Sequence, residues 1–305
     1  MRRLLVVVLL LASCLGLARG VAQATEGASS YYFPGSSTAF AVAVAPEPGF
    51  MAVSQTLFYS GRAGKAVLGG RVNFALEAEA FYEYMGGFYT FGEPVLGGRL
   101  QVGAVVPVGH ADVEAALGSR SVSDNRTGIG DTMVSAALYW KKGNFHTKLV
   151  ESVFVPTGEY GTGDLANVGR NYWGFDTALA ITWLNAATGT EISVTPGIMF
   201  NTKNTATDYK SGNEFHVDFA VNQFLAQNLA LGLHGYYYRQ VSGDSGSGAK
   251  LGGFEGESFG IGPALLWMPK AGKGNLSVIA KWLHDVHQEN RMHGDYGQLT
   301  VGYRF

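Results

Sequence analysis

The sequence predicts an all-β protein: a transmembrane up-and-down antiparallel β-barrel of about twelve strands, with short periplasmic turns and longer external loops. Three observations predict this fold. The final residues alternate in polarity, period-two segments recur along the chain, and short and long connections alternate between those segments. No apolar run after Ala24 approaches the roughly 20 residues that a membrane-spanning helix needs.

The last strand shows the alternation clearly. Leu299, Val301, Tyr303 and Phe305 fall on one face, and the residues between them fall on the other. A soluble sheet rarely finishes on an apolar edge, whereas a closed barrel in a bilayer gives this strand two neighbours. The four residues also resemble the terminal signal by which outer-membrane barrels are recognised for assembly. We therefore expect outer-membrane lipid and the barrel-assembly machinery as partners; the alternative is the final strand of a soluble β-sandwich.

Residues 1–24 have the features of a secretory signal peptide. Two arginines precede the apolar run from Leu4 to Leu11, and Ala22-Gln23-Ala24 is a small-x-small cleavage site. We expect cleavage of this segment and export to the outer membrane of a Gram-negative-type cell. Leu11-Ala12-Ser13-Cys14 also fits a lipoprotein box, although apolar residues follow Cys14. Since Cys14 is the only cysteine, no disulfide is expected after cleavage at Ala24.

The composition suits a single barrel domain over residues 49–305. Glycine is abundant (43 residues), apolar residues reach 47% and charged residues only 15%, which is low for a soluble protein. In a barrel, the lipid-facing surface supplies one apolar residue in two. The net charge is −2 and no basic run occurs, so nucleic acid is not an expected partner. The sequence does not indicate an oligomeric state.

Twelve period-two segments are bounded by turn signals. The second is expected to run on past Gly86-Gly87 to a turn at Gly92, and residues 118–128 read as a polar connection. The expected strands are Phe50–Tyr59, Val72–Tyr84, Leu96–Val113, Ile129–Lys141, Phe145–Val155, Tyr172–Leu184, Glu191–Asn201, Glu214–Leu225, Leu229–Val241, Ser258–Met268, Leu276–His287 and Tyr296–Phe305.

The connections and aromatic residues support a membrane barrel. Short turns follow the even-numbered strands and longer loops the odd-numbered ones, as expected when both ends of the barrel lie on one side of a membrane. Trp173 and Trp183 share one strand face at its two ends, with Phe175, Leu179 and Ile181 between them. This spacing is typical of aromatic girdles that bracket an apolar band.

The opposite strand faces carry polar residues that we expect to line the lumen. Both charge signs occur and tyrosines lie among them, whereas a dedicated anion pore would show a basic constriction. Such an interior suits charges that pair with one another and admits apolar or aromatic solutes; the alternative is that these groups only brace the barrel. The candidates are Glu77, Glu79, Glu83, Arg99, Asp131, Asp176, His216, Asp218, His234, Tyr236, Tyr238, Lys281, Asp285 and Arg304.

No motif supports catalysis or a cofactor. Gly243-Asp244-Ser245-Gly246 copies a serine-protease nucleophile sequence, but no matching histidine segment precedes it. The glycines of residues 161–166 have dinucleotide-fold spacing, yet no helix is expected after them. The seven histidines form no cluster of metal-ligand type. We expect no catalytic residue, no metal and no cofactor, and keep an outer-membrane hydrolase using Ser245 as a less favoured hypothesis.

Several loop segments together resemble one known family. They are Thr25-Glu26-Gly27, Tyr32-Phe33-Pro34-Gly35, Pro46-Glu47-Pro48-Gly49-Phe50, Val155-Pro156-Thr157-Gly158-Glu159-Tyr160, Gly169-Arg170-Asn171-Tyr172-Trp173, residues 204–216, Gly235-Tyr236-Tyr237-Tyr238-Arg239-Gln240, Asp244-Ser245-Gly246 and Gly260-Ile261-Gly262-Pro263. The chain resembles the phenol meta-pathway (MetA-pathway) outer-membrane family over nearly its whole mature length. The resemblance implies a barrel that admits hydrophobic molecules such as phenolics or sphingoid lipids, and it supplies no catalytic residues.

Residues 25–48 precede the first strand and combine Tyr31, Tyr32 and Phe33 with an apolar run from Ala39 to Ala45. We expect this segment to fold into the lumen as a hatch; the alternatives are a periplasmic tether or an extra strand. The expected function is passive uptake of small hydrophobic or aromatic compounds. The alternative is a barrel with a binding or structural role and no path through it.

Overall fold

A computed structural model describes residues 25–68, 71–117, 120–253, 255–269 and 276–305. The expected signal peptide and Cys14 lie outside these residues. One short 3-10 helix, η1 (Glu26–Ala28), precedes the strands, and no helix of the described chain is long and apolar enough to cross a membrane. The strands are β1 (Gly49–Leu68), β2 (Arg71–Val95), β3 (Gly98–Leu117), β4 (Arg120–Ile129), β5 (Thr132–Lys142), β6 (Phe145–Val155), β7 (Gly174–Asn185), β8 (Thr190–Asn201), β9 (Glu214–Ala226), β10 (Leu229–Gln240), β11 (Glu257–Trp267), β12 (Leu276–Glu289) and β13 (His293–Arg304).

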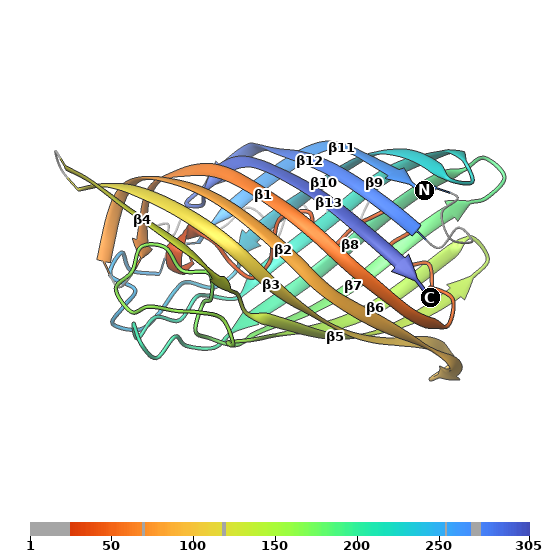
Figure 1. Cartoon of the computed structure of the whole chain (residues 1–305), viewed down its shortest axis with the longest axis horizontal. Coiled ribbons are helices and arrows are strands. Elements are labelled where there is room, and N and C mark those ends of the chain that lie inside the picture. The colour runs from red at the N-terminus through yellow and green to blue at the C-terminus, as the bar shows by residue number, and fades with distance from the viewer. Residues whose placement is uncertain (1–24, 69–70, 118–119, 254, 270–275) are drawn as a thin grey trace, which may run out of the picture.

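The strands close into an antiparallel barrel (Figure 1). Sequential neighbours pair around the ring, and β1 pairs with β13 from Met51↔Arg304 to Arg62↔His293. β4 and β5 share one position, because both pair with β3 and are separated only by Gly130 and Asp131. The ring therefore has the twelve positions that the sequence predicts. Closure gives every strand two neighbours, which an open sheet in hydrocarbon would lack.

Two expectations about strand lengths were wrong. β1 does not end at Tyr59 but reaches Leu68, and most of the expected polar connection at 118–128 belongs to strand β4. A transmembrane strand needs only about 9–11 residues, whereas β2 has 25. The additional length of β1–β4 therefore extends beyond the membrane. Water there bathes the outer face too, so the alternation is reversed while the backbone pairing continues: Glu77 and Asp112 are exposed, whereas Leu76 and Val113 are buried inside.

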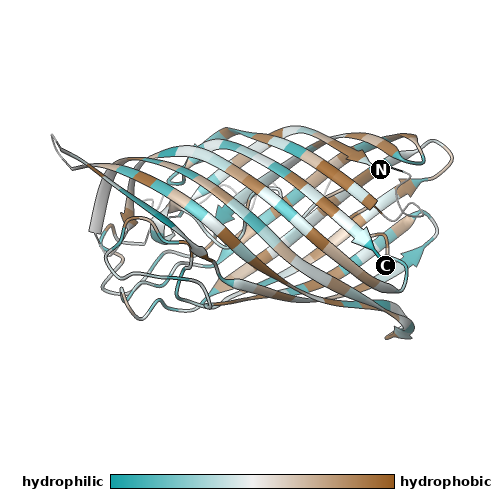
Figure 2. Cartoon of the chain, in the orientation of Figure 1, coloured by the Kyte–Doolittle hydropathy of each residue, from teal (hydrophilic) through white to brown (hydrophobic). Residues whose placement is uncertain are grey.

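Many large apolar side chains of the strands are exposed on the outside of the barrel, and apolar and polar positions are interspersed along the strands (Figure 2). On β7, buried residues alternate with outward ones, and Trp173, Phe175 and Leu179 are 42%, 37% and 40% exposed. Trp267 is also exposed, at the end of β11, and Trp282 is exposed in the middle of β12. Apolar side chains exposed at every second position suit contact with lipid. The chain is an outer-membrane-type barrel.

The two ends of the barrel differ. Short turns lie at one end, and two of them place Gly97 and Gly143 at φ values of 72° and 60°, which favour glycine. The C-terminal Phe305 lies at this end, where its backbone N–H donates to Phe50. The longer connections 156–173, 202–213 and 241–256 lie at the other end (Figure 1). We call these two ends the turn end and the loop end.

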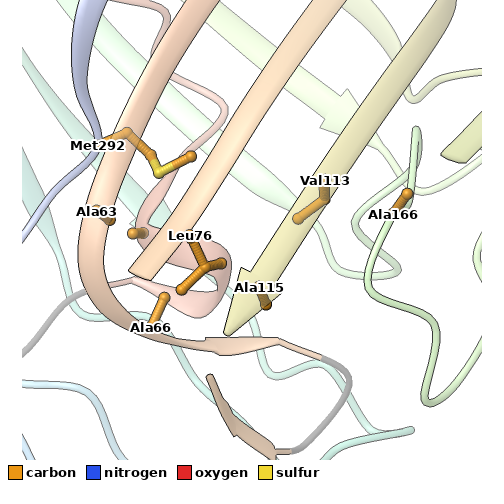
Figure 3. Packing of buried hydrophobic residues seen from close by; sticks show 8 residues of the cluster. Ala63, Ala66, Leu76, Val113, Ala115, Ala166 and Met292 are labelled. Atoms are coloured by element: carbon orange, nitrogen blue, oxygen red, sulfur yellow. The ribbon is translucent and has the colours of Figure 1, made fainter. Parts of the chain in front are cut away.

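A small apolar cluster packs inside the loop end. Ala63, Ala66, Leu76, Val113 and Ala115 come from the long strands β1, β2 and β3 (Figure 3). Ala28, Ala166 and Met292 come from η1, the 156–173 loop and the β12–β13 connection. The extended strands are therefore held to the loops and to the N-terminal segment by apolar packing.

We predict that Leu179→Arg lowers the free energy of unfolding in a bilayer by about 2–4 kcal/mol, because it places a charge midway between the Trp173 and Trp183 ends of β7. Asp112→Arg, at an exposed position on the extension of β3, is the control and should change it by less than about 0.5 kcal/mol. Urea titration of the refolded barrel measures both. Equal costs would show that no hydrocarbon contacts Leu179.

Candidate functional site in the barrel interior

The N-terminal segment, residues 25–48, runs through the barrel interior. It has no strand partner, so its backbone polar groups need other partners. The Asp218 carboxylate on β9 accepts from Ser37 N at 2.7 Å, and Glu191 on β8 accepts from Ala41 N at 2.9 Å. Lys281 Nζ on β12 donates to the carbonyls of Gly35 and Thr38 at 2.8 and 2.7 Å. Polar wall residues thus hold the segment's backbone in place.

Tyr32 is the most deeply buried aromatic of the segment. Its hydroxyl donates to Asp218, and its ring stacks on His216 with centroids 4.1 Å apart. His216 Nε2 in turn lies 2.9 Å from Asp176 Oδ1. The Tyr32 ring also stacks on Tyr238, with centroids 5.8 Å apart. One side chain therefore joins the segment to β7, β9 and β10.

Tyr31 points to a different part of the wall. Its hydroxyl donates to Asp131 at 2.6 Å, and its ring stacks on Phe154 with centroids 4.6 Å apart. Asp131 occupies the break between β4 and β5, where it also accepts from the backbone N–H groups of Gly158 and Arg170. The break in the strand therefore places a carboxylate where the 156–173 loop and the segment meet.

The loops at the loop end fasten onto the start of the segment. Glu26 accepts from Asn204 at 3.0 Å and from Thr207 at 2.9 Å. Burial raises the pKa of the Glu26 carboxyl, although these two hydrogen bonds and the charge of Arg170 oppose the shift. Asp244 accepts from Tyr209 and from Gly212 N, and burial raises its pKa to about 6. The 202–213 and 241–256 loops are therefore joined to each other and to η1.

A cavity of about 550 Å³ remains between the segment and one side of the barrel. The segment's side chains from Glu26 to Val42 form one boundary. The opposite boundary is mainly apolar and aromatic and comes from β1, β2, β3, β5 and β6, including Leu57, Tyr82, Tyr84, Phe88, Val105, Met133, Val150 and Phe154. The interior is thus divided: a polar side binds the segment, and an apolar side is left open.

Most of the predicted lumen residues lie in the interior. Asp131, Asp176, His216, Asp218, His234, Tyr236, Tyr238, Lys281 and Asp285 are all buried. Asp285 accepts from Tyr236 and from Gly294 N, and His234 lies 2.9 Å from Asn222. Arg99 and Arg304 lie towards the turn end, where Arg99 donates to the Pro46 carbonyl at 2.8 Å. The terminal residues Leu299, Val301, Tyr303 and Phe305 alternate with inward neighbours on β13 and at its end.

The expectation that Glu77 and Glu83 line the lumen was wrong, whereas Glu79 borders the cavity although its side chain is exposed. The three side chains alternate along β2 with those of Leu76, Ala78, Ala80 and Tyr82, which line the cavity, and therefore lie on the outer face. Glu83 accepts there from the Ser54 and Thr56 hydroxyls at 2.5 and 2.6 Å. Glu77 and Glu79 belong to the part of the hairpin that extends towards the loop end. The prediction placed them inward because they are polar. Carboxylates are equally stable on an outer strand face that is in contact with water.

The sequence-based candidates omitted several interior groups. Glu191 and Glu214 are fully buried on β8 and β9, and strand parity with Ser193 and His216 would have placed both inward. Lys148 lines the cavity from β6, and the same parity argument with Ser152 would have found it. Arg170 and Arg291 also line the cavity, but they lie in connections, where no periodicity indicates a direction.

The described residues contain no group of three or more potential metal ligands. Ser245 pairs through its backbone with Lys210, at N–O distances of 2.8 and 2.9 Å. The neighbouring Asp244 carboxylate accepts hydrogen bonds from the Tyr209 hydroxyl and from Gly212 N, so this loop motif joins the 241–256 loop to the 202–213 loop.

Solved structures with the same fold support the barrel. The crystal structure of the COG4313 outer membrane channel from Pseudomonas putida F1 matches with a TM-score of 0.69 and 13% identity, over 86% of this chain and 97% of that one. The β domain of the Bordetella autotransporter BrkA matches with a TM-score of 0.54 and 11% identity, over 84% and 100%. The translocator domain of the Neisseria meningitidis autotransporter NalP matches with a TM-score of 0.50 and 12% identity, over 85% and 90%. These likenesses show the fold of an outer-membrane barrel.

Among curated protein sequences, none matches this chain. A family model does: the one described as "Putative MetA-pathway of phenol degradation" matches residues 58–301. That match spans the strands from β1 to β13 and includes the polar wall, the loop-end connections and most of the cavity. The chain therefore belongs to this phenol-degradation-associated family of outer-membrane β-barrels.

Proposed function

We propose that the barrel is a channel for passive uptake of small hydrophobic or aromatic compounds. The cavity carries this proposal: its volume of about 550 Å³ lies in the range of small-molecule sites, and its open side is apolar and aromatic. The family's association with phenol degradation supports the same class of solute. The driving force would be the solute gradient, maintained by metabolism inside the cell.

We further propose that residues 25–48 act as the hatch of this channel. The backbone of residues 35–43 is held to the wall by hydrogen bonds to Asp218, Glu191, Thr182 and Lys281, which exchange more readily than a continuous strand ladder. The segment also forms one boundary of the cavity, so a shift of its backbone changes the width of the path. Residues 1–24 act in export only, as a cleaved signal peptide.

Filling the cavity tests the channel. Ala180→Trp places an indole from β7 into the cavity, so influx of radiolabelled phenol into Gram-negative cells that express the chain should fall to the level of cells without it. Thr177→Trp, on the outer face of the same strand, is the matched control and should leave influx unchanged. Intact cells are used because lipopolysaccharide slows free diffusion of apolar solutes. Wild-type influx no faster than that of cells lacking the chain would favour a barrel without a path.

Releasing the segment tests the hatch. Asp218→Ala removes the acceptor of two segment donors, which weakens docking by about 1.5–3 kcal/mol for each hydrogen bond. Hydrogen exchange at residues 31–43 and single-channel conductance in planar bilayers should both rise. Gln101→Ala is the control, since Gln101 is also buried in the wall but binds Thr90 and Tyr139 rather than the segment. Deletion of residues 27–45 should raise conductance further; unchanged conductance would rule out the hatch.

A further inference from the structure

The acidic residues that border the cavity are already bound by donors of the protein. Asp131 accepts from Tyr31, Gly158 and Arg170 N, and Asp176 interacts with His216. Glu26 accepts from Asn204 and Thr207. The exposed side chain of Glu79 alternates with inward neighbours and lies on the outer face. The acceptor oxygens of Glu26, Asp131 and Asp176 are thus already used in hydrogen bonds within the protein.

The basic residues of the cavity, in contrast, have no ion-pair partner within the described chain. Lys148, Arg170 and Arg291 all line the cavity, and none forms an ion pair within the part of the chain that the structure describes. Two carboxylates, Asp131 and Glu26, act on the Arg170 charge, and both already accept hydrogen bonds from other donors: Asp131 from Tyr31, Gly158 N and Arg170 N, and Glu26 from Asn204 and Thr207. Glu214 influences Arg291 but does not border the cavity.

These three cations contact mainly aromatic rings and one hydroxyl. Lys148 Nζ lies 5.6 Å from the Tyr139 ring centroid, and Arg170 lies 5.5 Å from that of Tyr31 while two of its nitrogens share the Ser29 hydroxyl at 3.2 Å. Arg291 lies 3.6 Å from the Tyr238 ring centroid; the residue is 5% exposed and one terminal nitrogen has no hydrogen-bond partner. A cation–π contact replaces only part of the hydration that a buried cation loses.

The cations lie at different depths of the cavity. Lys148 belongs to β6 close to the Gly143 turn, so it lies towards the turn end. Arg170 and Arg291 belong to connections at the loop end. Between them the lining is apolar and aromatic, including Tyr84, Val150 and Phe154. A solute that passes from one end to the other meets positive charge at both ends and an apolar surface between.

From this arrangement we infer that the channel selects aromatic monocarboxylates: organic anions with one carboxylate on an aromatic body. Guanidinium groups bind carboxylates with good geometry, and the tyrosine and phenylalanine rings match an aromatic body. Binding gives these cations the carboxylate partner that none of them has in the described chain, including the terminal nitrogen of Arg291 that has no hydrogen-bond partner. This inference rests on the proposed channel function and narrows its solutes from apolar compounds in general to anionic ones.

Matched aromatic probes test the inference. Benzoate, benzyl alcohol and benzylamine share one ring and differ in charge at pH 7, so their tracer influx should be compared in cells expressing the full chain. We expect benzoate influx to exceed benzylamine influx. Lys148→Met and Arg170→Gln should each lower benzoate influx roughly tenfold, the effect of one lost charge-assisted hydrogen bond. Influx of benzyl alcohol should not change.

Two control variants make the result specific. Lys148→Arg keeps the charge and should restore benzoate influx, whereas Lys203→Met removes an exposed loop cation outside the cavity and should have no effect. Heat-modifiable migration on gels shows whether each variant folds. Benzylamine influx equal to or above that of benzoate, or equal losses for all probes in Lys148→Met, would overturn the inference while leaving the channel intact.

Binding separates the two proposals. Calorimetry of the wild-type barrel in nanodiscs should detect benzoate binding that Lys148→Met weakens roughly tenfold. Binding of this kind without any influx would retire the proposed channel and support the anion site. Influx of phenol with no benzoate binding would retire the anion site alone.

Discussion

The need to satisfy every backbone polar group away from water is the constraint on which this structure depends. In the wall it is met by a closed ring, which β1 completes by pairing with β13. Inside the barrel, the N-terminal segment forms no ladder, and wall side chains take the place of a neighbouring strand. Asp218 and Glu191 accept from its N–H groups, and Lys281 donates to its carbonyls. The interior polar residues are therefore explained first by the segment and only then by a solute.

Much of the wall could be predicted from sequence because lipid imposes a simple pattern. Leu179 on β7 and Val301 on β13 alternate with inward residues as the period-two pattern indicates. The prediction failed where the strands leave the bilayer. At Glu77 and Glu79, water bathes the outer face, so polarity no longer distinguishes inside from outside. The same change of solvent hid the strand character of residues 120–129, whose polar sequence resembles a loop.

The interior was predictable in part. Parity correctly places Asp176, His216 and Asp218 on inward faces, but it does not identify their partners. Those partners are backbone atoms such as Ser37 N and the Gly35 carbonyl, in a segment without regular structure. Nor could parity reveal that the acids already accept hydrogen bonds while Lys148 and Arg170 have no carboxylate partner within the described residues. That distinction depends on distances between strands and loops that are far apart in the sequence.

The seam between β1 and β13 also has a consequence for the order of folding. Met51 pairs with Arg304, so the ring of strands is complete only when β13 has paired with β1. The segment directly precedes β1 and is enclosed in the barrel, with Tyr32 stacked on His216 and on Tyr238. Inserting the segment after the barrel has closed would require its bulky aromatic side chains to pass through the closed barrel. This obstacle is avoided when the segment is already inside before β1 pairs with β13. The position of the segment is therefore fixed when this last pair of strands forms.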